Sequence, residues 1–361
     1  MPVMTSTGRR AAGSLDVRSL WYTRCPVPTA SSVAISGGWL DREFEPDQIT
    51  VRSLGECRDP ELRLAHYTHA HPALFREGGV VPPLWASATT GANRLIGLAR
   101  VDQFQGLLAL RGSALADSGD LCGARIALPA RLGQPIDFSR AVSWSGIETT
   151  IATAGLTPRD VRLVDVASRE PFLSPAAGAR GASLYTAREN VRLYTAEVLA
   201  LIRGHVDAIY AAGPHALATA ALIDAVPVAA SRSEAHLRVL TVSAELLEAR
   251  PDLVHRYVGG LLRASRWAAT HASETWRVIA AEVGAAEEWA QAAYADHLVR
   301  SLQPQISDDL LDVLQSRADF LRDRDFIPSG VDVRVWLDTD PLQRALALHQ
   351  GQHGRDRQVS A

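Results

Sequence analysis

Short apolar runs alternate with amphipathic helical stretches along most of this chain, and that alternation predicts a layered α/β architecture. The expected strands cover residues 20–22, 49–53, 95–99, 106–110, 124–128, 161–166, 206–210 and 238–243. Helical periodicity is expected from about Thr29, over 144–154 and 187–203, and through most of 244–323. The pattern favours strands that are covered by helices on both faces.

The length of 361 residues is more than one ordinary hydrophobic core accommodates. A polar, glycine-containing stretch at 113–123 indicates that the chain crosses there from a first lobe to a second, and a later strand near 238 indicates that it returns to the first. The prediction is an α/β protein with two doubly wound lobes around a central cleft and a helical C-terminal region. Lobe 1, which carries the candidate site, takes residues 1–114 and 236–361; lobe 2, residues 115–235, closes the cleft. Ligands of such sheets bind at the carboxyl ends of the strands.

The composition excludes several function classes, because all 37 basic residues are arginine and none is lysine. Pyridoxal-phosphate enzymes, lysine aldolases, Walker A nucleotide sites and protein kinases all need an ammonium group. Glycine-rich dinucleotide fingerprints are also absent. A net charge of -3 gives no support to nucleic-acid or membrane-surface binding. A small-molecule ligand is therefore expected.

The three cysteines, Cys25, Cys57 and Cys122, have no paired spacing, which argues against a disulfide framework or a zinc site. Arginine, serine and glycine interrupt any apolar run within residues 1–22, and no later run approaches ~20 apolar residues. We expect a cytoplasmic monomer that does not enter a membrane.

Cys25 lies between Arg24 and Pro26, and the proline stiffens the backbone around the thiol. A helix that begins near Thr29 would direct the positive end of its dipole toward a thiolate and an anion. The alternative is a buried cysteine that acts as a small hydrophobic residue.

Histidines, an arginine and a glycine pair fall within fourteen residues: His66, His69, His71, Arg76, Gly78 and Gly79. A glycine pair lets backbone N–H groups face an anion, and arginine offers a planar two-pronged donor to carboxylate, phosphate, sulfonate or sulfinate oxygens. This pattern predicts an oxyanion cradle. Three alternatives remain: the histidines bind a metal, each histidine is solvated at the surface or satisfied by a hydrogen bond in the core, or Arg76 forms an ion pair with Glu77 or another carboxylate.

Residues 22–28 and 66–84, with their Cys-Pro, His-to-Arg and Gly-Gly elements, resemble the 2'-hydroxybiphenyl-2-sulfinate desulfinases of dibenzothiophene desulfurisation. The wider chain is similar to the periplasmic-binding-protein-like folds of sulfonate and nitrate uptake. The resemblance implies no cofactor. It also implies roles for five residues: catalytic Cys25, His66 that orients it, Arg76 that holds the sulfinate, Gly79 as a backbone donor and Trp144 in an aromatic wall. Thr23, His69 and His71 lie in the same motifs and are added as candidate substrate contacts, although 69 and 71 are histidines where this family has tyrosine and glutamine.

The implied reaction is hydrolysis of the aryl carbon–sulfur bond of 2'-hydroxybiphenyl-2-sulfinate, or a close aromatic sulfinate, to 2-hydroxybiphenyl and sulfite. The thiol could attack sulfur through a thiosulfonate-like intermediate, or it could protonate the ring carbon. Proton delivery is favoured, because a sulfinate anion repels a second anion. The alternative function is a solute-binding protein for an aromatic sulfonate or similar oxyanion in an ABC-type uptake system.

Overall fold

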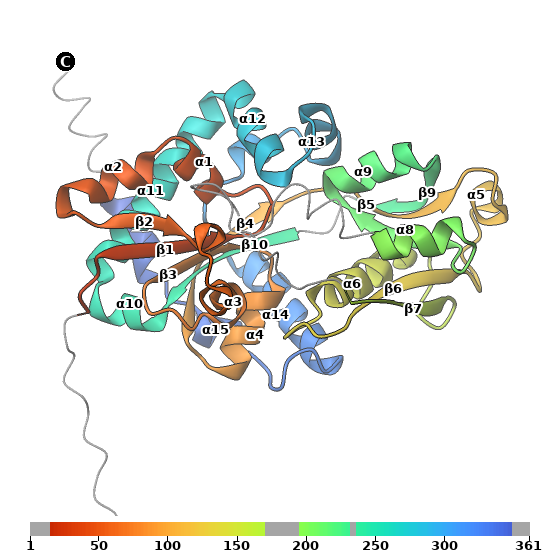
Figure 1. Ribbon diagram of the computed structural model, residues 1–361, viewed down its shortest axis with the longest axis horizontal. Coiled ribbons are helices and arrows are strands. Elements are labelled where there is room, and N and C mark those ends of the chain that lie inside the picture. Colours follow the sequence, from red (N-terminus) through yellow and green to blue (C-terminus); the bar gives the residue numbers. More distant parts are fainter. Residues whose placement is uncertain (1–14, 170–194, 232–235, 349–361) are drawn as a thin grey trace, which may run out of the picture.

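The computed structural model describes residues 15–169, 195–231 and 236–348, and within them the strands form two separate five-stranded sheets. Figure 1 shows the sheets side by side along the long axis of the molecule, each flanked by helices. The predicted two-lobe α/β fold is confirmed.

The first sheet has the order β2-β1-β3-β10-β4. β1, β2 and β3 run parallel, whereas β10 is antiparallel to both β3 and β4. The carboxyl ends of β1, β3 and β4 and the beginning of β10 therefore share one edge. The strands are β1 (Ser19–Arg24), β2 (Thr50–Ser53), β3 (Leu74–Gly78), β4 (Asn93–Val101) and β10 (His236–Ser243).

Helices cover both faces of this first sheet because their apolar residues recur at three- and four-residue spacing. On one face, the amphipathic helix α11 (Pro251–Thr270) packs with α1 (Ala30–Ser36), α2 (Trp39–Phe44) and α12 (Ala272–Val283). The other face is covered by α3 (Pro60–Thr68), α4 (Val81–Thr89), α14 (Asp308–Asp323) and α15 (Val333–Trp336). The remaining helical elements of this lobe are η1 (Glu45–Asp47), η2 (Leu54–Glu56), α10 (Ala244–Ala249) and η4 (Leu298–Arg300).

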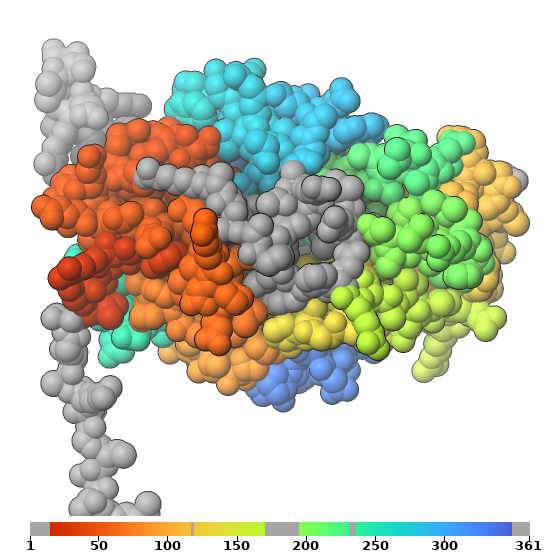
Figure 2. Space-filling model, viewed as in Figure 1, coloured from red at the N-terminus to blue at the C-terminus, as the bar shows by residue number. Residues whose placement is uncertain are grey.

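The second sheet has the order β7-β6-β8-β5-β9, with β5 antiparallel to both of its neighbours. Its strands are β5 (Gln105–Leu110), β6 (Arg125–Arg131), β7 (Arg162–Ser168), β8 (Ala208–Ala212) and β9 (Ala225–Ser231). The helices of this lobe are α5 (Ala114–Ser118), α6 (Phe138–Ala152), α8 (Thr195–Ile202) and α9 (Gly213–Leu222). α13 (Glu287–Ala293) packs against α9, and Figure 2 shows the cyan and blue surface of this region reaching toward the green second lobe.

The structure differs from the sequence analysis at β5 and β3, and it covers a third expectation only in part. β5 belongs to the second sheet, so the chain crosses between sheets at 102–104 rather than near 115, because β5 pairs with β8 and β9. β3 is a fully buried strand that the pattern does not predict, since its central residues are Arg76 and Glu77. The helix expected over 187–203 is described only as Thr195–Ile202; its first part lies outside the described residues, as do residues 1–14.

None of the described helices combines the length and apolar character that a bilayer crossing requires.

Candidate active site

A cavity of about 270 Å³ lies where the strand ends of the two lobes face each other. Cys25 follows β1 and Gly79 follows β3, and because these strands are parallel, both residues reach the same edge of the first sheet. The opposite wall comes from α6, β8 and the beginning of α9. The cavity is lined by Cys25, Pro26, Val27, Gly79–Val81, Gln103, Gln105, Phe138, Ala141, Val142, Ser145, Gly146, Tyr210, Ala212–His215, His236–Arg238, Val283, Tyr294, Arg317, Phe320 and Leu321.

The sulfur of Cys25 lies between an arginine and a histidine. Arg76 Nη2 donates to Cys25 Sγ at 3.3 Å, and His66 Nε2 is 3.8 Å from the same sulfur. The backbone N–H of Cys25 donates to the carbonyl of Glu77 at 3.3 Å, which ties the thiol to the end of β3. Residues 25, 66 and 76 thus converge on the thiol, and of these three Cys25 is the one that lines the cavity.

Arg76 is a fully buried cation in the middle of β3. Its guanidinium also donates through Nε to the carbonyl of His66 at 3.2 Å and through Nη1 to the carbonyl of Gly79 at 2.9 Å. These contacts hold the planar group in one orientation, with Nη2 toward the sulfur.

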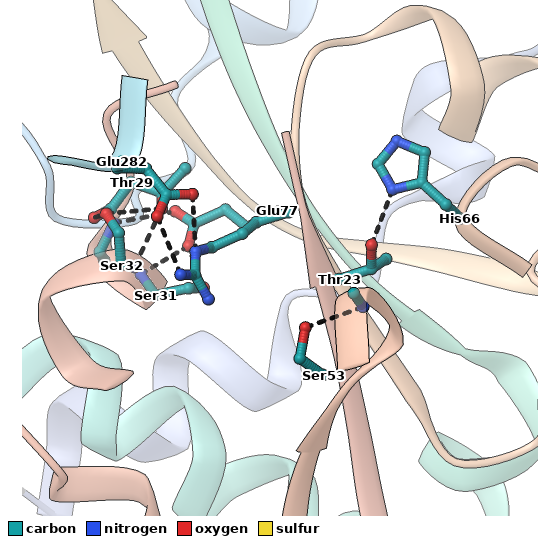
Figure 3. Close-up of polar contacts among 11 residues, drawn as sticks. Thr23, Thr29, Ser31, Ser32, Ser53, His66, Glu77 and Glu282 are labelled. Atoms are coloured by element: carbon teal, nitrogen blue, oxygen red, sulfur yellow. Dashed lines mark hydrogen bonds and ion pairs between the residues drawn. The ribbon is translucent and has the colours of Figure 1, made fainter. Parts of the chain in front are cut away.

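The alternative of an ion pair between Arg76 and Glu77 is wrong. Adjacent residues of a strand point to opposite faces, and the Glu77 carboxylate lies on the face of α1. Figure 3 shows Glu77 and His66 on opposite sides of the strands. Glu77 accepts from the backbone N–H of Ser31 at 2.8 Å, from that of Ala30 at 3.3 Å, and from the hydroxyl of Ser31.

These contacts also correct the expected role of the helix after Pro28. The helix begins as predicted, and Thr29 is its N-cap, with its hydroxyl accepting from the N–H of Ser32. Because Glu77 and Thr29 use the free N–H groups, the helix terminus does not face the thiol. Arg76 and His66 are the polar groups that contact the sulfur instead.

His66 is held as a neutral imidazole beside the thiol. It is buried on α3, and the hydroxyl of Thr23 is 2.8 Å from its Nδ1 (Figure 3). Burial, and then the charges of Arg76 and His69, hold the pKa of His66 well below its ordinary value of 6.5. The neutral ring can therefore form a hydrogen bond with the Cys25 thiol without placing a second positive charge beside the sulfur.

The two glycines play different parts. A Cβ at Gly78 would lie 2.6 Å from Cys25 Sγ, so glycine is required for the sulfur to approach β3 this closely. Gly79 lines the cavity, and its carbonyl is a partner of Arg76.

Of the predicted site residues, only Cys25 and Gly79 line the cavity. His66, Arg76 and Gly78 are not among the lining residues, and neither are Thr23, His69 and His71. The hydroxyl of Thr23 contacts His66 Nδ1, the ring nitrogen that is not directed at the sulfur. His69 Nε2 is 3.1 Å from the hydroxyl of Thr241, and His71 Nδ1 accepts from the N–H of Ala73 at 3.0 Å. Their local contacts within the first lobe explain why they turn away from the cavity. Throughout the described residues, no three histidine, cysteine or acidic side chains converge closely enough to share a metal ion.

The assignment of Trp144 to the cavity wall is also wrong. Lining positions on α6 recur at three- or four-residue spacing, at 138, 141, 142, 145 and 146, and position 144 falls outside that stripe. Trp144 instead donates to Glu148 at 2.9 Å and lies under the guanidinium of Arg324. The aromatic wall consists of Phe138, Tyr210, Tyr294 and Phe320, which come from four separated segments.

Sequence reasoning missed the polar residues that line the cavity: Gln103, Gln105, Ser145, His215, His236, Arg238 and Arg317. The alternation of His236 and Arg238 with apolar residues in a buried strand was the available signal. For Gln103 and Gln105 the sequence offers no such signal, because their position depends on where the chain crosses between the two sheets.

No family model matches the chain. A curated relative, the 2'-hydroxybiphenyl-2-sulfinate desulfinase of Rhodococcus erythropolis, is 27% identical over 92% of this chain and 94% of its own length. The desulfinase of Rhodococcus qingshengii matches equally well. Among solved structures, a cysteine-to-serine mutant of the enzyme DszB in complex with biphenyl-2-sulfinic acid superposes with a TM-score of 0.75, at 27% identity over 92% of this chain and 99% of that one. The chain is thus similar to these desulfinases over more than nine tenths of its length.

More distant structures share the fold alone. The sulfonate-binding proteins SsuA from Methylobacillus flagellatus and from Escherichia coli superpose with TM-scores of 0.66 and 0.60, at 15% and 14% identity. They cover 93% and 89% of this chain, with 96% and 92% of their own lengths. The expected likeness to periplasmic-binding-protein folds is therefore confirmed.

Proposed function

We propose that this protein is a desulfinase that hydrolyses the aryl carbon–sulfur bond of an aromatic sulfinate and releases sulfite. The observation that supports this most directly is the contact of Cys25 Sγ with both Arg76 and His66 at the wall of a cavity with aromatic sides. Its similarity to the 2'-hydroxybiphenyl-2-sulfinate desulfinases favours 2'-hydroxybiphenyl-2-sulfinate or a close relative as the substrate.

In this proposal Arg76 binds the sulfinate. Its guanidinium is buried and oriented by two carbonyls, and its remaining direction faces the thiol. A sulfinate placed beside Cys25 would accept charge-assisted hydrogen bonds from Nη2 and a further bond from the N–H of Gly79. Phe138, Tyr210 and Phe320 would contact the two aromatic rings.

The Cys25 thiol then delivers a proton to the ring carbon that bears sulfur. The carbon–sulfur bond breaks, its electron pair restores the aromatic ring, and sulfur dioxide leaves. Water adds to sulfur dioxide to give bisulfite, and the proton released returns to the thiolate. Proton delivery is preferred to attack on sulfur because the sulfinate beside Arg76 is already an anion, which repels a thiolate nucleophile. Arg76 stabilises the thiolate during the step, and neutral His66 orients it.

The test is an assay of the purified protein with 2'-hydroxybiphenyl-2-sulfinate, scored for sulfite and for fluorescent 2-hydroxybiphenyl. We expect Cys25→Ser to lower the rate by about 10³-fold or more while binding of the sulfinate, followed by calorimetry, persists. Cys57→Ser and Cys122→Ser are matched controls, because neither residue lines the cavity.

Sulfite release by Cys25→Ser at the wild-type rate would remove the thiol from the mechanism. Tight binding of aromatic sulfonates and sulfinates without any turnover would instead favour a solute-binding protein, the function that the more distant structural neighbours suggest.

A further inference from the structure

Two arginines, Arg238 and Arg317, line the cavity, and the desulfinase reaction as proposed above uses neither. Arg317 is half-buried and donates to the hydroxyl of Ser145, whereas Arg238 is buried. Arg238, near the beginning of β10, lines the cavity and is only 5% exposed. Its Nη2 donates to Gln103 Oε1 at 3.3 Å, and its Nη1 donates to the carbonyl of Leu237 at 3.4 Å. Both bonds are long, and Nε has no partner among the described residues. The guanidinium therefore has unused donors.

Among the described residues, no carboxylate is in hydrogen-bond contact with Arg238, although the charge of Glu77 interacts with it favourably from a distance. The residues that line the cavity include no aspartate or glutamate. On the same face of the sheet, Glu77 is bound by Ser31 and Ala30, while Glu282 forms a bidentate ion pair with Arg24 at 2.7 and 2.8 Å. A buried cation without a contacting counterion is unfavourable, and an anionic ligand would relieve that cost.

Arg238 and Arg76 lie on opposite faces of the first sheet. Thr241 of β10 pairs with Arg76 and Leu240 pairs with Glu77, and side chains alternate along a strand. Arg238 therefore shares the face of Leu240 and Glu77, whereas Arg76 lies on the other face with His66. The two guanidinium groups also have no common partner. The two guanidinium groups can therefore bind two separate anionic groups.

A neighbouring amide adds further donors. Gln105 Oε1 accepts from the hydroxyl of Tyr210 at 2.8 Å and lies 3.1 Å from His236 Nε2, so the oxygen of this amide is already engaged. Gln105 Nε2 is buried and has no partner among the described residues. Burial, with the charges of Arg238 and Arg317, lowers the pKa of His236 to about 3, so this histidine is neutral and brings no competing charge.

We propose that Arg238, assisted by Gln103 and Gln105, binds a second anionic group on the substrate, a carboxylate carried by the aromatic body. Among the close relatives of 2'-hydroxybiphenyl-2-sulfinate, the preferred substrates are then biphenyl sulfinates that carry a carboxylate as well, with the sulfinate at Arg76 and Cys25 and the carboxylate at Arg238. This inference rests on the proposed desulfinase function and specifies its substrate class.

The experiment compares biphenyl-2-sulfinate with its 2'-, 3'- and 4'-carboxylated forms. The wild-type protein should show a kcat/KM for sulfite release at least about 10-fold higher for one carboxylated isomer than for the parent compound. Arg238→Gln should lower kcat/KM for that isomer by about 30-fold or more and change that for the parent by less than about threefold. The same comparison by calorimetry uses Cys25→Ser with and without Arg238→Gln.

Equal losses for both substrates in Arg238→Gln would overturn the proposal, since Arg238 would then act on the sulfinate or the thiol. A wild-type protein that favours no carboxylated isomer would overturn it without any variant, even if Arg238→Gln does not fold. Failure of the desulfinase function is distinguishable: no sulfite would appear from any compound, whereas binding of the dianion would still depend on Arg238.

Discussion

The Cys25 sulfur is positioned by what touches it rather than by its own loop. Arg76 and His66 contact it from the side of α3, and the missing side chain of Gly78 lets it approach β3. Each of these residues occupies its place because of buried backbone or side-chain contacts. Small changes of shape at these positions should therefore affect catalysis more than folding.

Replacement of Arg76 by lysine tests the geometry of the anion site. Lysine keeps the charge but cannot donate at once to His66, Gly79 and the sulfur. We expect Arg76→Lys to weaken sulfinate binding by about 10-fold or more. Calorimetric titration with the sulfinate measures the effect, and Arg52→Lys, at an exposed position on β2, is the control. An unchanged affinity would show that Arg76 does not bind the sulfinate.

Replacement of Gly78 by alanine tests the close approach of the sulfur. The added Cβ would displace Sγ from Arg76, because the present separation would be 2.6 Å. Gly78→Ala should lower kcat by about 10-fold or more, since misplacement by ~1 Å can cost 10²-fold. Gly330→Ala, whose Cβ meets nothing closer than 3.6 Å, is the matched control. Full activity in Gly78→Ala would mean that the thiol need not remain beside Arg76.

At the scale of secondary-structure elements, β3 carries important side chains on both faces of the first sheet. Arg76 serves the thiol on one face, and Glu77 anchors the beginning of α1 on the other. α1 in turn packs against α11 and α12. The bidentate pair of Arg24 with Glu282 attaches α12 to the residue before the thiol. The placement of Cys25 thus depends on helices that are distant in sequence.

Replacement of Glu77 by glutamine should loosen this anchor. The amide offers one acceptor where the carboxylate offers two, so one of the N–H groups of Ala30 and Ser31 loses its partner. We expect the free energy of unfolding to fall by about 1–3 kcal/mol. Denaturant unfolding monitored by circular dichroism measures the loss. Glu287→Gln, at the exposed beginning of α13, should change stability by less than about 0.5 kcal/mol. Equal stabilities of Glu77→Gln and wild type would contradict the anchoring role.

At the scale of the whole molecule, two buried histidines, His66 and His69, and the half-buried His236 are neutral in the folded state. Burial lowers the pKa of His69 and of His236 to about 3, and it holds that of His66 well below 6.5. Each therefore binds fewer protons when folded than when unfolded. In the unfolded chain each histidine has a pKa of about 6.5. Its contribution to the free energy of unfolding is therefore complete above about pH 6.5 and is lost as the pH falls from there toward 3.

The free energy of unfolding should accordingly fall between pH 7 and pH 5, by roughly 2 kcal/mol for each such histidine. His69→Asn should make this dependence shallower, and asparagine tolerates the left-handed backbone at position 69, where φ is 53°. His205→Asn, at an exposed position, should leave the dependence unchanged. Denaturant unfolding at both pH values checks this, and equal stabilities at pH 5 and pH 7 would contradict it.

The amino-acid sequence by itself determined the local structure and the chemical inventory of this protein. Apolar periodicity predicted the α/β layers, Thr29 marked the beginning of α1, and the motifs around Cys25 and Arg76 indicated an anion site, because these signals act over a few residues. Only the tertiary structure decided that β3 is a buried strand, that Glu77 rather than the thiol occupies the end of α1, and that Trp144 faces away from the cavity. It also brought Arg238 and Gln103, 135 residues apart, to the same wall. Strand order and sheet crossing arise from contacts between distant segments, and no local pattern of residues encodes them.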